Sequence, residues 1–269
     1  MQIINEMRII NKIFTLLLLV FLLAGFGGCA NSVAAEIACP PVKQPKTAEA
    51  VLQKPQFAWQ WPQDLPENHG ISNAALARFH SELDEVNVLA AVIVKDDYII
   101  DEYYKPGYDE NSLFIMNSAS KSLTSALIGI AIDKGYIDSV DVPVGEFFPE
   151  LENSGITIWH LLTHTSGLAS TDDVRWDAWR NSTNWLDYIF NLPVVAEPGT
   201  EFSYSTGNTH LLAAILEQAT GMGLYDFAKE NLFAPLGMRT ARIDTDPQGI
   251  GDGAAGFSHP LGHLFLGQA

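Results

Sequence analysis

Apolar residues recur at two different periods in the stretch that begins near residue 72. Behind Ser72, a residue type that often caps helix N-termini, four apolar positions follow the three-to-four-residue spacing of one helix face. They are Leu76, Phe79, Leu83 and Val86. Two runs rich in β-branched and aromatic residues follow, over residues 89–94 and 98–104, separated by Lys95-Asp96-Asp97. The pattern therefore predicts a helix followed by a β-hairpin.

Beyond residue 117, most apolar residues follow the spacing of helices. An apolar run over residues 123–132 ends at Gly135, a residue type that commonly follows the last turn of a helix. Further helical segments are expected over residues 156–168, 184–190, 209–219 and 224–233. Residues 246–269 contain six glycines and show no alternating pattern, so we expect no strand there. The order of elements indicates an α/β (α+β) fold with one hairpin and a large helical region.

A different pattern precedes the folded part. Residues 13–26 are apolar apart from one threonine, and Arg8 and Lys12 stand before them. This run is short for a membrane span but typical of the apolar core of a secretory signal peptide. Two glycines then precede Cys29, as at the processing site of bacterial lipoproteins. We therefore predict a signal peptide over residues 1–28, a lipid on Cys29, and a protein anchored to a membrane of the bacterial cell envelope.

Two alternatives remain for the N-terminus: cleavage after Val33-Ala34-Ala35, or a membrane helix that is never cleaved. Residues 29–66 are rich in Pro, Ala, Gln and Lys without a period, which predicts a tether. The folded domain is then expected over residues 67–258, with an atypical tail over residues 259–269.

Composition and charge narrow the function. Hydrophobic residues make up 47% and charged residues 17% of the chain, which is typical of a globular protein. The net charge of −17 argues against nucleic acid as a partner, because phosphate binding needs a basic surface. The two cysteines are Cys29 and Cys39, and a lipid on the first would leave no structural disulfide.

The candidate chemistry begins with Ser118 and Lys121. No other serine in the chain stands three residues before a lysine. On a helix these positions share a face, and unpaired N–H groups at a helix start disfavour the ammonium form of the lysine. A neutral lysine can take the serine proton and make the oxygen nucleophilic. The alternative is a serine-rich helix start with a solvated lysine.

A second candidate is Tyr204, in the loop segment 202–208. A nearby cation favours the phenolate form of a tyrosine, so Tyr204 could share proton transfer with the lysine; the alternative is a packed turn tyrosine. His160 and His164 have the i, i+4 spacing of a zinc pair, but the glutamate of the H-E-x-x-H motif is missing. They are read as structural histidines. No metal and no cofactor are expected.

Four motifs occur in a recognisable order. They are the Ser118/Lys121 helix start, residues 160–168 (HLLTHTSGL), residues 198–205 (PGTEFSYS) and residues 231–238 (NLFAPLGM). Together they resemble the β-lactamase-related serine hydrolases, a family that includes class C β-lactamases, penicillin-binding proteins and 6-aminohexanoate-dimer hydrolases, with the last branch nearest. The resemblance implies an antiparallel sheet flanked by helices. It also implies Ser118 as nucleophile, Lys121 as its activator, Tyr204 as the second-motif tyrosine, and a small amide or ester substrate.

The chain departs from the family pattern in two places. Many relatives have Asn where Thr206 stands, and Asn208 cannot be assumed to replace it. The third family motif, a Lys- or His-led triplet on a strand, is absent, and residues 259–262 (HPLG) do not supply it, since proline does not suit a central strand. We therefore expect a C-terminally truncated domain that lacks the later strands. The alternative function is a catalytically impaired envelope lipoprotein.

Overall fold

The computed structural model describes residues 62–238 and 240–260. The predicted signal peptide, Cys29, most of the tether and residues 261–269 lie outside these ranges, and the statements about them stay predictions. Within the described ranges, no helix has both the length and the apolar character needed to cross a membrane. Residues 62–64, at the end of the predicted tether, run beside the hairpin: Gln63 forms a parallel bridge with Ile99.

The N-terminal part is a helix packed on a β-hairpin. Its elements are the 3₁₀ turn η2 (Pro66–His69), the helix α2 (Asn73–Glu85) and the antiparallel strands β1 (Ala90–Lys95) and β2 (Tyr98–Tyr104). The predicted cap is confirmed, because the Ser72 hydroxyl accepts a hydrogen bond from the Ala75 N–H at 3.2 Å. His80 of α2 pairs with Asp101 of β2 at 2.7 Å. The predicted helix and hairpin are both present.

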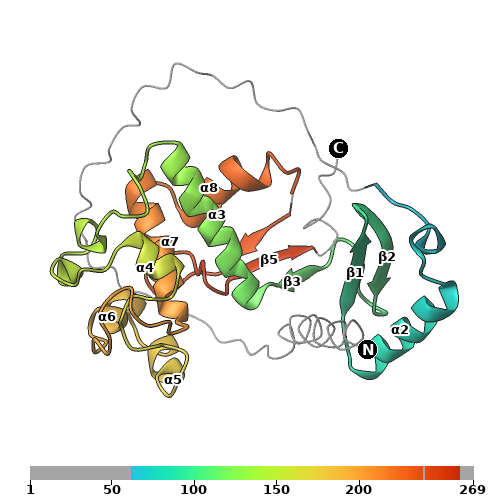
Figure 1. Cartoon of the computed structure of the whole chain (residues 1–269), viewed down its shortest axis with the longest axis horizontal. Coiled ribbons are helices and arrows are strands. Elements are labelled where there is room, and N and C mark those ends of the chain that lie inside the picture. The colour runs from blue at the N-terminus through green and yellow to red at the C-terminus, as the bar shows by residue number, and fades with distance from the viewer. Residues whose placement is uncertain (1–61, 239, 261–269) are drawn as a thin grey trace, which may run out of the picture.

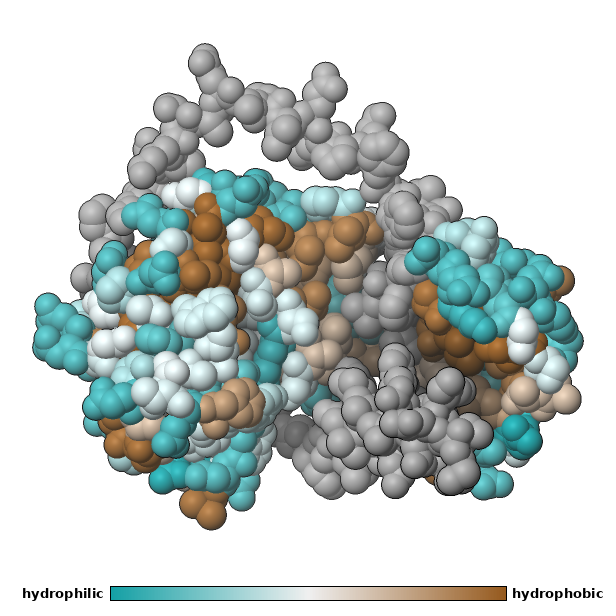
Figure 2. All heavy atoms as spheres, viewed as in Figure 1, coloured by the Kyte–Doolittle hydropathy of each residue, from teal (hydrophilic) through white to brown (hydrophobic). Residues whose placement is uncertain are grey.

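This unit has a small apolar core of its own. Leu76 and Leu83 of α2 are buried with Ile99, Ile100 and Tyr103 of β2, and none of the five belongs to the main core cluster. In Figure 1 the unit lies to one side of the helical body. Figure 2 shows hydrophilic residues over much of its surface, with the largest group of hydrophobic residues on the side turned toward the helical body.

A second sheet corrects the expectation that no strand follows residue 246. It contains β3 (Leu113–Ile115), β4 (Arg242–Ile243) and β5 (Phe257–Pro260), in the order β3-β5-β4 and antiparallel throughout. The central strand is therefore β5, which extends past residue 258, where the domain was expected to end. Strands this short carry no readable alternation. Pro260 is tolerated because β4 pairs only with Phe257 and Ser258, so β5 has a neighbouring strand on one side only at Pro260.

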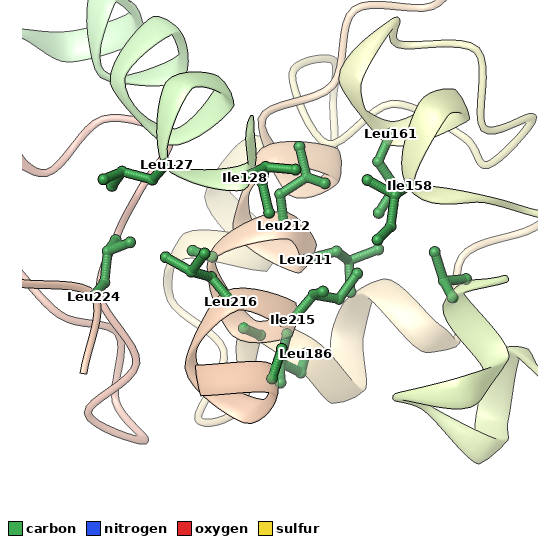
Figure 3. Packing of buried hydrophobic residues seen from close by; sticks show 14 of the residues in the cluster. Leu127, Ile128, Ile158, Leu161, Leu186, Leu211, Leu212, Ile215, Leu216 and Leu224 are labelled. Carbon is green, nitrogen blue, oxygen red and sulfur yellow. The ribbon is translucent and has the colours of Figure 1, made fainter. Parts of the chain in front are cut away.

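The helical body surrounds α7 (Thr206–Thr220). Its other elements are η3 (Asn117–Ala119), α3 (Ser120–Asp133), η4 (Val144–Glu146), η5 (Pro149–Leu151), α4 (Ile158–Leu162), α5 (Trp176–Arg180), α6 (Trp185–Phe190), α8 (Leu224–Ala228) and the π-helical turn η6 (Lys229–Phe233). Nearly every residue of α7 is buried, most of its polar residues included, so this helix lies at the centre of the helical body. Figure 3 shows Leu211 and Leu212 of α7 among side chains from α3 and α4.

The start of α7 differs from the prediction. The helix begins at Thr206 and not at Thr209, although it ends at Gly221 as expected, with that glycine in the left-handed region (φ 68°). The Asp172 carboxylate accepts hydrogen bonds from the Thr206 N–H and, at 2.6 Å, from the Thr206 hydroxyl. A capping partner so distant in sequence leaves no local signal, which is why the first turn of α7 was missed.

Candidate active site

Ser118 lies in the turn that joins β3 to α3. It is the middle residue of η3, two residues before α3 begins at Ser120, and so lies outside the helix itself. The preceding residue, Asn117, has φ 46°, a left-handed conformation that asparagine tolerates better than most residues. Met116 fastens the start of the turn, because its N–H donates to the carbonyl of Phe257 in β5 at 2.8 Å. The sheet and the helix together therefore fix where Ser118 stands.

Lys121 reaches Ser118 from the first turn of α3. Its Nζ lies 3.2 Å from Ser118 Oγ, the arrangement that the i, i+3 spacing predicts. The same amine donates a hydrogen bond to the carbonyl of Ala254 at 3.1 Å. Lys121 is half-buried, so it is held between two oxygen atoms and not free in solvent.

Tyr204 comes to the same serine from a distant part of the chain. Its phenol donates a hydrogen bond to Ser118 Oγ at 2.8 Å, although the two residues are 86 positions apart. The Lys121 amine stands 5.0 Å from the centre of the Tyr204 ring. Tyr204 remains 39% exposed, so the cluster reaches the protein surface. The structure thus brings together the three residues that the sequence marked as candidates.

His164 supports Tyr204, a role that the sequence did not indicate. Its ring stacks on the Tyr204 ring at 4.8 Å between centroids, and its Nδ1 accepts a hydrogen bond from the Ser205 N–H at 3.2 Å. Burial, and to a lesser degree the charge of Lys121, lower the pKa of His164, which favours the neutral ring that this hydrogen bond needs. The sequence predicted a structural role for His164 but did not indicate that its partner is Tyr204.

The other histidine of that pair is engaged elsewhere. The Nδ1 of His160 accepts a hydrogen bond from the Thr157 N–H at 3.2 Å, which caps the start of α4. In the parts of the chain that the structure describes, no three His, Cys, Asp or Glu side chains stand close enough to hold a metal ion.

Asn208 is not part of the Ser118 cluster. Its side chain is buried in α7, where Oδ1 accepts a hydrogen bond from the Ser166 hydroxyl at 3.0 Å. Thr206 is occupied in capping the same helix. Among the described residues, Ser118 Oγ therefore has its hydrogen bonds with Lys121 and Tyr204, and not with Thr206 or Asn208.

Comparison with known proteins identifies the class. The family model for Beta-lactamase matches residues 72–262, and the chain belongs to this family. Over 202 residues it is 28% identical to the 6-aminohexanoate-dimer hydrolase of Paenarthrobacter ureafaciens, covering 68% of this chain and 51% of that protein. Over 140 residues it is 36% identical to Penicillin-binding protein 4* of Bacillus subtilis, covering 49% and 31%.

A solved structure agrees in fold. The octameric penicillin-binding protein homologue from Pyrococcus abyssi superposes with a TM-score of 0.60 at 23% identity, covering 72% of this chain and 55% of that one. The β-lactamase-like fold and the family resemblance inferred from the four motifs are therefore confirmed. The chain spans between about a third and about half of the length of the two curated relatives named above.

Proposed function

We propose that this protein hydrolyses amide or ester bonds through a covalent acyl-enzyme on Ser118. The observation that carries the proposal is the position of Ser118 Oγ, which lies within hydrogen-bond reach of both the Lys121 amine and the Tyr204 phenol. A serine is a weak nucleophile unless a base removes its proton, and an amine at 3.2 Å is placed to do so. Family membership supports the same reaction class.

In the proposed reaction the neutral Lys121 amine takes the hydroxyl proton while Ser118 Oγ adds to the substrate carbonyl carbon. The adduct collapses as the bond to the leaving nitrogen or oxygen breaks, and the leaving group receives a proton from Lys121, directly or through Tyr204. Water then adds to the acyl carbonyl and gives a proton to the same base. The Ser118 ester bond breaks and the serine recovers its proton, so the products are a carboxylic acid and an amine or alcohol.

The proposed substrate is a small molecule with a linear amide or an ester. The name of the 6-aminohexanoate-dimer hydrolase, one of the relatives, points to a linear amide. This reaction uses no cofactor, because the side chains supply both the nucleophile and the proton transfers.

Labelling with a fluorophosphonate tests the assignment. Intact mass and peptide mapping should place one adduct on Ser118, no adduct should form in Ser118→Ala, and Lys121→Ala should slow labelling by about 100-fold or more, the scale of a lost general base. Ser205→Ala is the matched control, since this neighbouring serine is buried and should not react. An adduct on another serine, or no adduct in the wild type under conditions that label a known serine hydrolase, would refute the proposal.

A further inference from the structure

The Lys121 amine has a second partner, a backbone carbonyl from a distant part of the chain. Ala254, 133 positions away, accepts one of its hydrogen bonds at 3.1 Å. The carbonyl of the preceding residue, Gly253, accepts a hydrogen bond from the buried Thr124 hydroxyl at 2.7 Å. Thr124 lies three residues beyond Lys121 on α3, on the same face of the helix. Two successive carbonyls of the turn over residues 252–256 therefore accept hydrogen bonds from side chains of α3.

One buried carboxylate closes this turn from the other side. Asp252 is only 2% exposed, and its Oδ1 accepts hydrogen bonds from the N–H groups of Ala254 at 3.2 Å and Ala255 at 3.1 Å. The Asp252 carbonyl also accepts from the Gly256 N–H at 2.8 Å. The peptide groups on both sides of Ala254 are thus held, which sets the direction of its carbonyl.

Arg180 holds the carboxylate in turn. Its Nη1 donates to Asp252 Oδ2 at 2.8 Å, and its guanidinium carbon lies 3.9 Å from the centre of the Trp185 ring. A buried carboxylate is costly unless it is paired and hydrogen-bonded, and here both conditions are met. The planar guanidinium suits the combination of ion pair and ring stacking. The Asp252 carboxylate therefore has three hydrogen-bonding partners, Arg180, Ala254 and Ala255, and touches neither Ser118 nor Lys121 by a hydrogen bond.

We propose that Asp252, held by Arg180, is a positioning residue for Lys121, acting through the Ala254 carbonyl. The inference rests on the proposed function, in which Lys121 takes the Ser118 proton. A neutral amine has two N–H groups and one lone pair. When one N–H is committed to Ala254, fewer orientations of the amine remain, and Ser118 Oγ at 3.2 Å is close enough for its hydroxyl to donate to the lone pair. Without a fixed carbonyl the amine loses this preorganisation.

Three variants distinguish a role of Asp252 in positioning Lys121 from a role in stabilising the fold. Asp252→Ala removes the acceptor for both N–H groups, whereas Asp252→Asn keeps an amide oxygen for them. Asp246→Ala is the matched control. Asp246 is a buried carboxylate, with 5% exposure, that accepts from the Gln248 and Ile250 N–H groups and pairs with His210 at 3.0 Å. It therefore resembles Asp252 in burial and partners, but its turn offers no carbonyl to Lys121.

The measurement is the rate of Ser118 acylation by p-nitrophenyl acetate as a function of pH, per mole of folded protein, with a thermal melt of each variant. Asp252→Ala should acylate about 10- to 100-fold more slowly, since a misplacement of the order of 1 Å can cost about that much. Asp252→Asn should recover most of the rate. Asp246→Ala should melt earlier yet acylate at the wild-type rate. Equal rates in Asp252→Ala and wild type, or an equal slowing in Asp246→Ala, would overturn the proposal.

Two further readouts keep the test decisive. Where Asp252→Ala does not fold, Thr124→Val is used in its place. It removes the hydrogen bond from the Thr124 hydroxyl to the Gly253 carbonyl with little change in side-chain volume. Slower acylation of this folded variant supports the proposal, and an unchanged rate contradicts it. Where wild type forms no adduct on Ser118, the proposed function fails. The side-chain ¹⁵N resonance of Lys121, assigned by its loss in Lys121→Ala, then decides this inference alone. It should shift in Asp252→Ala and not in Asp246→Ala; no shift in Asp252→Ala would overturn the positioning role.

Discussion

For the substitution Gly207→Ala, helix propensity and packing predict opposite changes in the free energy of unfolding. Gly207 is the second residue of α7, and alanine is the better helix former. A Cβ at this position, however, would lie 2.8 Å from Cγ2 of Thr171 and 3.3 Å from two carbons of Ile189. Thr171 is fully buried, and its hydroxyl accepts a hydrogen bond from the Gly207 N–H at 2.9 Å. Thr171 therefore cannot rotate away without breaking that bond.

The magnitudes decide the sign. Replacing glycine by alanine inside a helix gains up to about 1 kcal/mol. Overpacking a buried site costs about 1–3 kcal/mol, and a lost hydrogen bond costs about 1 kcal/mol more. We expect Gly207→Ala to lower the free energy of unfolding by about 1–3 kcal/mol, on the balance of these values. For a domain of this size that corresponds to a melting temperature lower by about 2–12 °C.

Gly129→Ala is the matched control. Gly129 lies within α3, is exposed, and would place its Cβ in open space with nothing within 4 Å. The same substitution should therefore raise the free energy of unfolding there, by about 0.5–1 kcal/mol. Urea unfolding of both variants beside wild type is the assay. If Gly207→Ala also raises the midpoint, propensity governs both sites and the packing argument at Thr171 is wrong.

Three other outcomes are expected. Tyr204→Phe removes the hydroxyl that donates to Ser118 at 2.8 Å. Fluorophosphonate labelling should then slow by about 100-fold or more, while the melting temperature stays near that of the wild type. An unchanged labelling rate would exclude proton transfer by the phenol. Because the pKa of His164 is lowered, folding favours its neutral form, so stability should fall as the pH drops below the ordinary imidazole value of about 6.5. His164→Asn tolerates the left-handed backbone (φ 56°) and should flatten that dependence, whereas an unchanged pH slope of the urea midpoint would contradict it. Cells fed radioactive palmitate should label wild type but not Cys29→Ala, and equal labelling would rule out the lipid anchor.

Features that depend only on neighbours along the chain could be predicted from the amino-acid sequence. The cap at Ser72, the hairpin turn at residues 95–97 and the end of α7 at Gly221 each follow from local propensity. The Ser118–Lys121 pair belongs to the same group, because a helical geometry brings residues three apart onto one face whatever surrounds them. The order of four local motifs was also enough to indicate the family.

Tertiary structure alone decided the rest. The strand β5 has only four residues and a proline, and it exists because β3 and β4 supply hydrogen bonds on both sides. The first turn of α7 forms because Asp172, distant in sequence, caps it. The Ala254 carbonyl meets Lys121 only when the turn closed by Asp252 packs against α3. Such pairings join residues far apart in the chain, and neither periodicity nor propensity, which act over a few residues, can encode which distant groups will meet.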